Sequence, residues 1–387
     1  MSSFTERLFT RLRGDRPIWL VVALLSLASM LAVYSATGTL AYKYQGGNTE
    51  YYFFKHIVLL LGGWFLMYLT HLIHYKKFSD WSPIFLVLSI VFLVFTLLTA
   101  SEINDARRWI TIPIIGYSFQ ASDLAKIGLI LFVARMISTK QDVIKDLNEA
   151  FIPIILPIIV VCGLIAPANL STSLVLFFVC MLMMFIGRLD MKYIGALFLL
   201  GVIMFVVLIA VGEAFPGLHI RSATWISRMR DFLGDDNGAY QVQQAKIAIA
   251  KGGFWGVGPG NSLQRNYLPH PYSDFIFSVI IEEYGLLGAF VVIALYLYLM
   301  FRVVRLVTLA PKAFGAMAAV GLGLLITIQA LANMAVSVNM VPVTGQTLPL
   351  ISMGGNSVLF TCISLGIIQS ISKYVQAAKD DPDDVDD

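Results

Sequence analysis

The sequence predicts an all-α polytopic membrane protein, with about ten transmembrane helices and one large extracytoplasmic loop between the seventh and the eighth. Of its 387 residues, 58% are hydrophobic and 13% are charged, and the mean hydropathy is +0.79. Soluble domains carry about 25% charged residues, so the composition excludes an ordinary soluble protein. Apolar runs of ~17–25 residues, the length that crosses a bilayer, lie near 18–38, 53–71, 81–99, 121–137, 152–167, 170–187, 192–212, 274–302, 313–337 and 348–372.

Basic residues predict the orientation of these spans. The first run follows a cluster of arginines and is too long for a cleavable signal, so we expect a retained anchor with a cytoplasmic N-terminus. Ten spans then place most basic residues of the short loops inside and both termini in the cytoplasm. The formal net charge of +3 reflects this loop asymmetry and gives no reason to expect a nucleic-acid partner.

The predicted organisation follows from the same pattern. Its five parts are a basic cytoplasmic N-terminus (1–17), transmembrane helices 1–7 (18–212), an extracytoplasmic loop (213–273), transmembrane helices 8–10 (274–373), and an acidic, disordered cytoplasmic tail (374–387).

Three acids stand at the start of the eighth span. Asp274 lies where a polar loop gives way to an apolar run, and Glu282 and Glu283 lie within that run. Burying an ionised side chain in hydrocarbon costs at least ~2.5–3.5 kcal/mol, so acids placed there are functional candidates. If 274–302 is one helix, Glu282 lies within about 80° of the face of Asp274 and roughly 12 Å deeper, with Glu283 on the opposite side.

Three cations are candidates for an anionic ligand. Arg107 and Arg108, between the third and fourth spans, either belong to an interfacial loop anchored by Trp109 or hold a phosphate or carboxylate of a lipid-linked ligand. Lys126 lies one helical turn after Asp123. It either pairs with that acid while reaching the interface, or points into the bundle beside the two arginines.

Two segments are rich in glycine and proline. The stretch 252–264 can approach an anionic ligand closely, or can be a flexible cap over the bundle. The stretch 341–359 breaks an apolar region, and irregular backbone at membrane depth must be buried in protein or line a wet cavity. It is either a structural re-entrant turn or the lining of a groove that faces Asp274. In the long loop, just before the glycine-rich stretch, residues 241–251 are predicted to form a short amphipathic helix on the outer surface.

Other site types have little support in the sequence. Cys162, Cys180 and Cys362 lie in apolar spans, where cysteine behaves as a small hydrophobic residue. We find no Cys and His spacing that predicts a metal site, and no phosphate-binding glycine motif between a strand and a helix. A nucleotide-binding activity is therefore not expected.

Several motifs together resemble the shape, elongation, division and sporulation (SEDS) family. They are RRW at 107–109, QASDLAK at 120–126, the glycine-rich run at 252–264, LPHPYSDFIFSVIIEEYG at 268–285 and TGQTLPLISMGGNS at 344–357. The resemblance covers about 20–375. VYSAT at 33–37 and the basic start are more similar to the division branch, FtsW, than to the elongation branch, RodA.

This resemblance implies a peptidoglycan glycosyltransferase that polymerises lipid II on the outer face of the bacterial cytoplasmic membrane. Asp274 matches the family's essential aspartate and Glu282 the first of its two glutamates. The basic positions fall on Arg107, Arg108 and Lys126, and we assign further substrate binding to Gln264, Ser273, Thr347 and Ser352. Departures from the family pattern are His270, Pro271 and Tyr272 before the aspartate, together with Ala121, Asp123, Asn169 and Met353.

The residue types suit that chemistry. Asp274 is expected to be the general base for an acceptor 4-hydroxyl, with Glu282 tuning or positioning it, while the three cations stabilise the leaving pyrophosphate. A divalent cation, Mg²⁺ or Mn²⁺, is a candidate cofactor. The expected partners are lipid II, undecaprenyl-pyrophosphate-linked glycan, a class B penicillin-binding protein transpeptidase and divisome membrane proteins. The alternatives are a lipid II flippase, a non-catalytic scaffold for division proteins, and an elongation polymerase of the RodA type.

Overall fold

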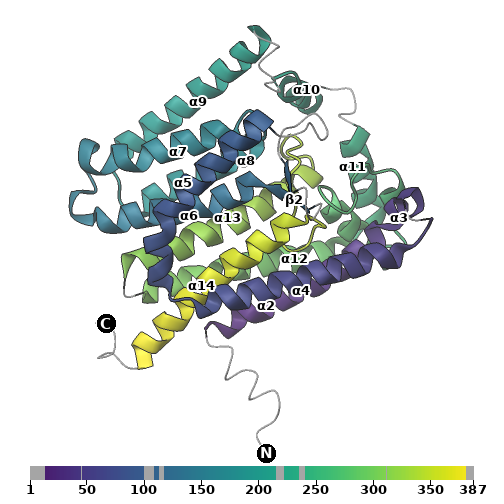
Figure 1. Cartoon of the computed structure of the whole chain (residues 1–387). Helices are drawn as coiled ribbons and strands as arrows, with labels where there is room; N and C mark the ends of the chain where they lie inside the picture. Colours follow the sequence, from purple (N-terminus) through teal and green to yellow (C-terminus); the bar gives the residue numbers. More distant parts are fainter. Residues whose placement is uncertain are drawn as a thin grey trace, which may run out of the picture.

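The computed structural model describes residues 14–44, 46–99, 109–112, 117–214, 222–234, 240–310 and 312–380. Long helices that run side by side make up most of it (Figure 1). They are α2 (Arg16–Ala36), α4 (Thr49–Leu72), α5 (Tyr75–Thr99), α6 (Ala121–Thr139), α7 (Ile152–Ile165), α8 (Leu170–Ile186), α9 (Met191–Ala214), α12 (Ile276–Leu309), α13 (Ala313–Ser337) and α14 (Asn356–Asp380).

Shorter elements connect these helices. They are α3 (Gly38–Tyr44), α10 (Ser222–Leu233), α11 (Tyr240–Gly252), a π-helix at Leu147–Phe151, and 3-10 turns at Gln141–Val143 and Gln264–Asn266. An antiparallel hairpin of β1 (Trp109–Ile112) and β2 (Tyr117–Gln120) precedes α6, with Trp109 opposite Gln120. The prediction of a helical polytopic fold is confirmed, and the hairpin is an addition to it. The helix expected at 241–251 is α11.

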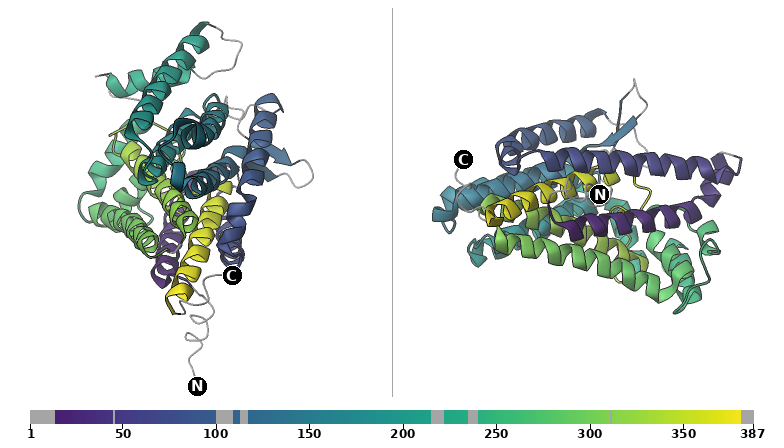
Figure 2. Two further views of the ribbon diagram at one scale, coloured as in Figure 1. Left: turned by 90° about the vertical axis from the view of Figure 1, so that its left-hand side faces the viewer. Right: turned by 90° about the horizontal axis from the view of Figure 1, so that it is seen from below.

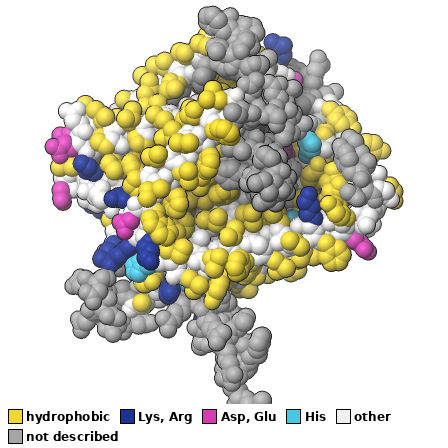
Figure 3. All heavy atoms as spheres, viewed as in Figure 1, with side chains coloured by type: hydrophobic (Ala, Val, Ile, Leu, Met, Phe, Trp, Pro, Cys, Tyr) yellow, Lys and Arg dark blue, Asp and Glu magenta, His cyan; other side chains and the backbone are white. Residues whose placement is uncertain are grey.

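Each predicted apolar run coincides with one long helix. Eight helices of the described chain are long and apolar enough to cross a bilayer, and the 17-residue α8 is a shorter apolar helix. The helix α6 lies outside that set and carries Asp123, Lys126 and Arg135. Hydrophobic side chains cover the long helices on the face in Figure 3, and charged side chains lie mostly toward its two ends. The number of spans remains a prediction.

The helix α13 forms the centre of the bundle, and it packs against α6, α8, α12 and α14. Glycines let its neighbours approach closely: a Cβ at Gly321 would lie 2.6 Å from the sulfur of Met183, and one at Gly323 would lie 2.9 Å from Val303. Small residues serve the same purpose in other membrane bundles. In contrast, α9 extends from the edge of the bundle, and much of its surface is exposed (Figure 2).

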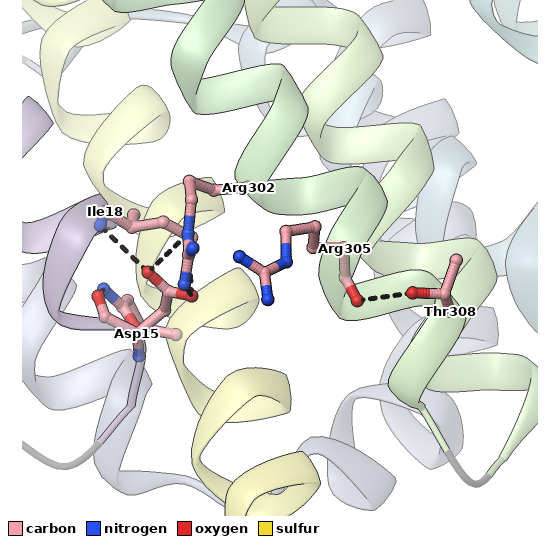
Figure 4. A network of polar contacts seen from close by, with 6 residues as sticks. Asp15, Ile18, Arg302, Arg305 and Thr308 are labelled. Carbon is pink, nitrogen blue, oxygen red and sulfur yellow. Dashed lines mark hydrogen bonds and ion pairs between the residues drawn. The ribbon is translucent and has the colours of Figure 1, made fainter.

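A polar cluster joins three helices at the end of the bundle where the described chain begins and ends (Figure 4). Asp15 caps α2 by accepting the Ile18 N–H at 3.2 Å, and its carboxylate pairs with Arg302 of α12. Gln369 of α14 accepts the Asp15 N–H and donates to the Asp15 carbonyl, both at 2.9 Å. Arg305 lies beside this group. The charge of Asp15 is thus compensated although the residue is buried.

The opposite end of the bundle contains a break in α12. Gly285 has φ 67° and ψ −168°, a conformation open essentially to glycine alone. The glycine-rich loop supplies the missing partners: Val257 and Gly258 donate their N–H groups to the carbonyls of Glu282 and Glu283 at 2.9 and 3.0 Å. The Leu286 N–H donates to the carbonyl of Gly253 at 3.0 Å. The loop therefore completes the hydrogen bonding of the interrupted helix.

Glycines allow the loop and the helix to approach backbone to backbone. A Cβ would lie 2.1 Å from the Ile281 oxygen at Gly252, 2.2 Å from the Glu283 oxygen at Gly256, and 2.2 Å from the Phe254 oxygen at Gly285. The sequence offered ligand contact or flexibility as reasons for the glycines of this loop. At Gly252 and Gly256 the close approach is to α12.

We expect Gly285→Ala to destabilise the protein by about 1–3 kcal/mol through backbone strain alone, and by more through overlap with Phe254. The measurement is the thermal midpoint of the purified protein in detergent. Gly163→Ala in α7 is the matched control, because a Cβ there meets nothing within 4 Å. Equal midpoints for the two variants would contradict the role of Gly285.

Candidate functional site

A polar cavity of about 380 Å³ lies at the end of the bundle where α6, α8 and α12 begin and α13 ends. Its walls come from these helix ends, from the segment before α12, and from the irregular segment before α14. Charged and aromatic lining residues are Asp123, Lys126, His270, Tyr272 and Asp274, and the others include Gln120, Asn169, Thr172, Ser273, Gln329, Gln346, Thr347, Met353 and Ser357.

Asp274 lies in the turn that precedes α12, with its side chain partly buried and facing the cavity. The Ser273 hydroxyl donates to its Oδ1 at 2.8 Å. Gly345, at φ 64°, lies across from its other oxygen, and a Cβ there would come 3.6 Å from Oδ2. One carboxylate oxygen is thus held by a neighbouring hydroxyl, and the other lies against the glycine of the irregular segment.

Asn333 of α13 fixes the backbone around Asp274. Asn333 is buried, and its Nδ2 donates to the carbonyls of Asp274 at 2.9 Å and Gln346 at 2.7 Å, so both protons of the amide are used. Ser352 adds a second link, because its hydroxyl donates to the Ser273 carbonyl at 2.6 Å. Two segments that are distant in sequence therefore meet in one hydrogen-bonded unit.

The irregular segment is held by side chains from the surrounding helices. The carbonyl of Thr347 accepts from Gln329 at 3.2 Å, that of Ile351 from Ser29 at 2.8 Å, and that of Pro349 from the Tyr296 hydroxyl. Non-helical backbone in a membrane protein needs such partners because lipid offers none. The sequence left a structural turn and a cavity lining as alternatives for this segment, and the structure combines them.

Lys126 points into the bundle and also pairs with Asp123. The Nζ–Oδ1 distance is 2.8 Å, and the two side chains are 11% and 5% exposed. Both residues line the cavity. Lys126 is therefore the one lysine or arginine among the described lining residues, and the same lining contains two aspartates, Asp123 and Asp274.

Glu282 lies outside this cavity. It is fully buried, and its carboxylate accepts hydrogen bonds from the Ser262 hydroxyl and from the N–H groups of Leu263 at 3.1 Å and Gln264 at 3.2 Å. The expected alignment with Asp274 fails because α12 begins at Ile276, and Asp274 belongs to the preceding turn. The observed contacts make Glu282 an anchor for the loop that follows α11.

Glu283 anchors the same loop from another side. The Ser35 hydroxyl of α2 donates to it, and the N–H of Ser262 lies at 3.4 Å. Arg265 donates to the carbonyl and hydroxyl of Ser35 at 3.0 and 2.8 Å. The two buried acids, this arginine and two serines thus join the loop to α2 and α12. Charge-assisted hydrogen bonds of this kind offset the cost of burying a carboxylate.

The other predicted site residues lie in different places. Ser273 and Thr347 line the cavity, whereas Gln264 and Ser352 are buried and absent from its described lining. The Ser352 hydroxyl also accepts the Leu348 N–H at 2.8 Å. Arg107 and Arg108 lie outside the described residues.

Sequence reasoning missed the cavity amides. Gln329 was not predicted as a lining residue, although a polar amide in an apolar run was an available signal, and Gln346 was covered only by the groove alternative for 341–359 without being singled out. The Nε2 of Gln346 is buried and has no hydrogen-bond partner in the described structure, so it is a donor available to a ligand. Asn169 was noted only as a departure from a family pattern. It lines the cavity and also caps α8, by accepting the Thr172 N–H at 3.3 Å.

The described side chains bring together no group of three His, Cys, Asp or Glu residues that could enclose a metal ion. A Mg²⁺ ion is commonly held by one or two carboxylates together with substrate phosphates. The carboxylates of Asp123 and Asp274 fit that donor set only with oxygens from a substrate. When bound, such an ion would neutralise phosphate charge, and proton transfer would still depend on the chain's own residues.

Fold and cavity define the class: a polytopic helical membrane protein with a charged, amide-lined cavity at one end of its bundle. The chain belongs to the FTSW_RODA_SPOVE family, described as cell cycle proteins, whose model matches residues 15–377.

Curated relatives match along nearly the whole chain. A "Probable peptidoglycan glycosyltransferase FtsW" of Trichlorobacter lovleyi is 32% identical over 372 residues, covering 94% of each chain. "Stage V sporulation protein E" of Bacillus subtilis is 31% identical over 367 residues, covering 93% of this chain and 97% of that one.

Solved structures share the fold. The crystal structure of the Thermus thermophilus rod shape determining protein RodA has a TM-score of 0.67 at 22% identity, over 93% of this chain and 97% of that one. A chain from the structure "Structural coordination of polymerization and crosslinking by a peptidoglycan synthase complex" has a TM-score of 0.71 at 23% identity, covering 94% and 98% of the two chains.

We expect Glu282→Gln to loosen the loop that follows α11. The glutamine NH2 group would face the N–H groups of Leu263 and Gln264, which are donors as well. A buried donor left without an acceptor lowers the free energy of unfolding by about 1–3 kcal/mol. Limited proteolysis should cut the segment after α11 faster, and the thermal midpoint should fall. Glu149→Gln, at an exposed glutamate, is the control. Unchanged cleavage of the loop in Glu282→Gln would contradict its anchoring role.

Proposed function

We propose that this protein is a peptidoglycan glycosyltransferase that polymerises lipid II into glycan strands, with Asp274 as the general base. The observation that carries the proposal is that Asp274 and Lys126 line one cavity although they belong to different parts of the chain. A base and a cation within one partly enclosed space are the two groups that glycosyl transfer from a pyrophosphate requires. The names of the curated relatives support the same activity.

The proposed reaction joins two lipid-linked sugars. The oxygen of the acceptor 4-hydroxyl forms a bond with the anomeric carbon of the donor, and its proton passes to the Asp274 carboxylate. The bond between the anomeric carbon and the pyrophosphate oxygen breaks, and the electron pair leaves with the pyrophosphate. Lys126 stabilises the charge that develops there, and Asp123 keeps the ammonium in place.

The neutral groups of the cavity hold the sugars. The amides of Gln329 and Gln346 and the hydroxyl of Thr347 offer donors and acceptors to hydroxyl and acetamido groups. The Asn333 side chain donates to the carbonyls of both Asp274 and Gln346, so the base and the sugar-binding amide are held at a fixed distance from each other. Arg107 and Arg108 are proposed to bind pyrophosphate from their loop.

The proposed location is the bacterial cytoplasmic membrane, with the cavity toward the outer face. The arginines and lysines near both described chain ends support a cytoplasmic position for that end of the bundle, because positive charge marks the inner side. The cavity lies at the other end. A lipid II flippase would need a route between the two ends, and a cavity confined to one of them favours surface chemistry.

A class B penicillin-binding protein is the proposed partner. One related structure is that of a peptidoglycan synthase complex that coordinates polymerisation with crosslinking, and a transpeptidase partner would supply the crosslinking. A role in cell division is proposed from the relatives named FtsW, with the elongation role as the alternative. Divisome membrane proteins would then be further partners.

We expect Asp274→Asn to abolish polymerisation of labelled lipid II by the purified protein, with and without a class B penicillin-binding protein. The amide keeps the shape of the carboxylate but cannot accept the proton, and removing a general base typically costs about 10²–10⁴-fold. Asp142→Asn, at an exposed aspartate of a connecting turn, is the control. Normal strand synthesis by the Asp274→Asn variant would exclude the proposed base, and lipid II flipping without polymer in vesicles would favour a transporter.

Asn333→Leu should lower kcat by about tenfold or more with KM changed less than about threefold, because small displacements of a reacting group are costly while the substrate contacts remain. The leucine keeps the volume and removes both donors to Asp274 and Gln346. Ser337→Ala on the same helix is the matched control, since its hydroxyl bonds only to its own helix. A proportional loss of kcat in both variants would indicate general destabilisation instead of positioning.

A further inference from the structure

A second cavity lies outside the bundle end, between α10, α11 and the segment after α13. Its volume is about 610 Å³, and it shares no described lining residue with the first cavity. The two helices are too short to cross a bilayer. The second cavity therefore belongs to the extracytoplasmic region of the proposed topology.

A thin wall separates the two cavities. Pro269 lines the second cavity and His270 the first, and likewise Val343 lines the second and Gly345 the first. Both the segment before Asp274 and the irregular segment thus have residues that line the first cavity and nearby residues that line the second. A separate hydrophobic cluster supports this wall and includes Ala245, Leu268, Phe275, Val279 and Val336.

The helix α10 turns a polar face toward the second cavity. Thr224, Ser227, Arg228 and Asp231 follow the i, i+3, i+4, i+7 spacing of one helix face, and all four line the cavity. Arg228 donates to the carbonyl of Val343 at 3.0 Å and so ties α10 to the wall.

Polar groups of α11 and apolar surface complete the lining. Tyr240 and Gln241 face the cavity from α11, while Val242, Pro342 and Phe232 supply apolar surface. Hydroxyl and amide groups beside apolar and aromatic surface suit a sugar, which has polar edges and apolar C–H faces.

The charges of the two cavities differ. In the second, the described lining holds one arginine and one aspartate, and the arginine is already engaged with the wall. The first holds Lys126 together with the carboxylates of Asp123 and Asp274. An uncharged sugar backbone fits the second cavity, because most of its lining consists of hydroxyl, amide and apolar groups.

We propose that the second cavity binds saccharide units of the glycan strand, on the outer side of the wall that carries Asp274. The ligand class is a β-1,4-linked chain of N-acetylated amino sugars. This inference rests on the proposed function, since a strand is the product of that reaction. A strand held beside the reacting centre remains at high effective concentration for the next addition, so the cavity favours long products over single transfers.

The first test fills the cavity. Ser227→Trp places a large ring among its lining residues, and Leu233→Trp, at a position that is 73% exposed and absent from that lining, is the matched control on the same helix. We expect Ser227→Trp to shorten the mean strand about fivefold or more while the rate of the first coupling changes less than about twofold, because only retention of the strand is lost. An unchanged length distribution in Ser227→Trp would overturn the proposal.

The second test measures binding without catalysis. The native cysteines are buried, so Thr224→Cys or Leu233→Cys introduces one accessible thiol. The probe is the tetramer of β-1,4-linked N-acetylglucosamine. It should slow maleimide labelling of Thr224→Cys about threefold or more and leave Leu233→Cys unchanged, because a bound sugar covers only the cavity. Equal labelling rates with and without the tetramer would overturn the proposal.

These experiments separate the two proposals. Protection of Thr224→Cys should persist when Asp274→Asn is also present, since sugar binding in the second cavity needs no base. If the unsubstituted protein makes no polymer while protection is observed, the glycosyltransferase proposal fails and the saccharide site stands. If polymer forms at normal length in Ser227→Trp, the saccharide site fails and the glycosyltransferase proposal stands.

Discussion

The structure depends on one constraint: backbone that leaves the helical path within the bundle must find hydrogen-bond partners in the protein. Between α13 and α14 the chain is irregular, and Ser29, Tyr296, Gln329 and Asn333 donate to its carbonyls. These donors come from α2, α12 and α13, so three helices define the path of one segment. These hydrogen bonds fix the irregular segment beside the turn that carries Asp274, and both line the first cavity.

The same constraint explains the buried acids. Where α12 breaks at Gly285, the loop after α11 supplies N–H groups to the helix carbonyls, and the side chains of Glu282 and Glu283 accept from residues near Ser262. An ionised carboxylate is costly in a bundle unless several donors surround it. The loop therefore supplies the donors that the buried acids need, and the acids hold the loop against α12. The chain leads from this anchored loop into the turn at Asp274.

Much of this architecture follows from the sequence. Hydropathy located the long helices, and the glycine- and proline-rich stretch after α13 predicted irregular backbone that is present. The hairpin before α6 escaped prediction because four-residue strands leave little periodic signal. The predicted face shared by Asp274 and Glu282 assumed a helix from Asp274 onward. Since α12 begins at Ile276, Asp274 is not on that helix, and helical geometry does not relate its direction to that of Glu282.

By itself, the sequence determined the class of protein, the course of its apolar helices and the polar residues that no lipid-facing surface would tolerate, because composition and periodicity are local properties of the chain. Only the tertiary structure decided which of those residues meet. Asp274 and Lys126 share a cavity because α6 and α12 begin at the same end of the bundle. Glu282 is close to Asp274 in sequence but is directed to the loop, since its partners lie there and burial without them would be too costly.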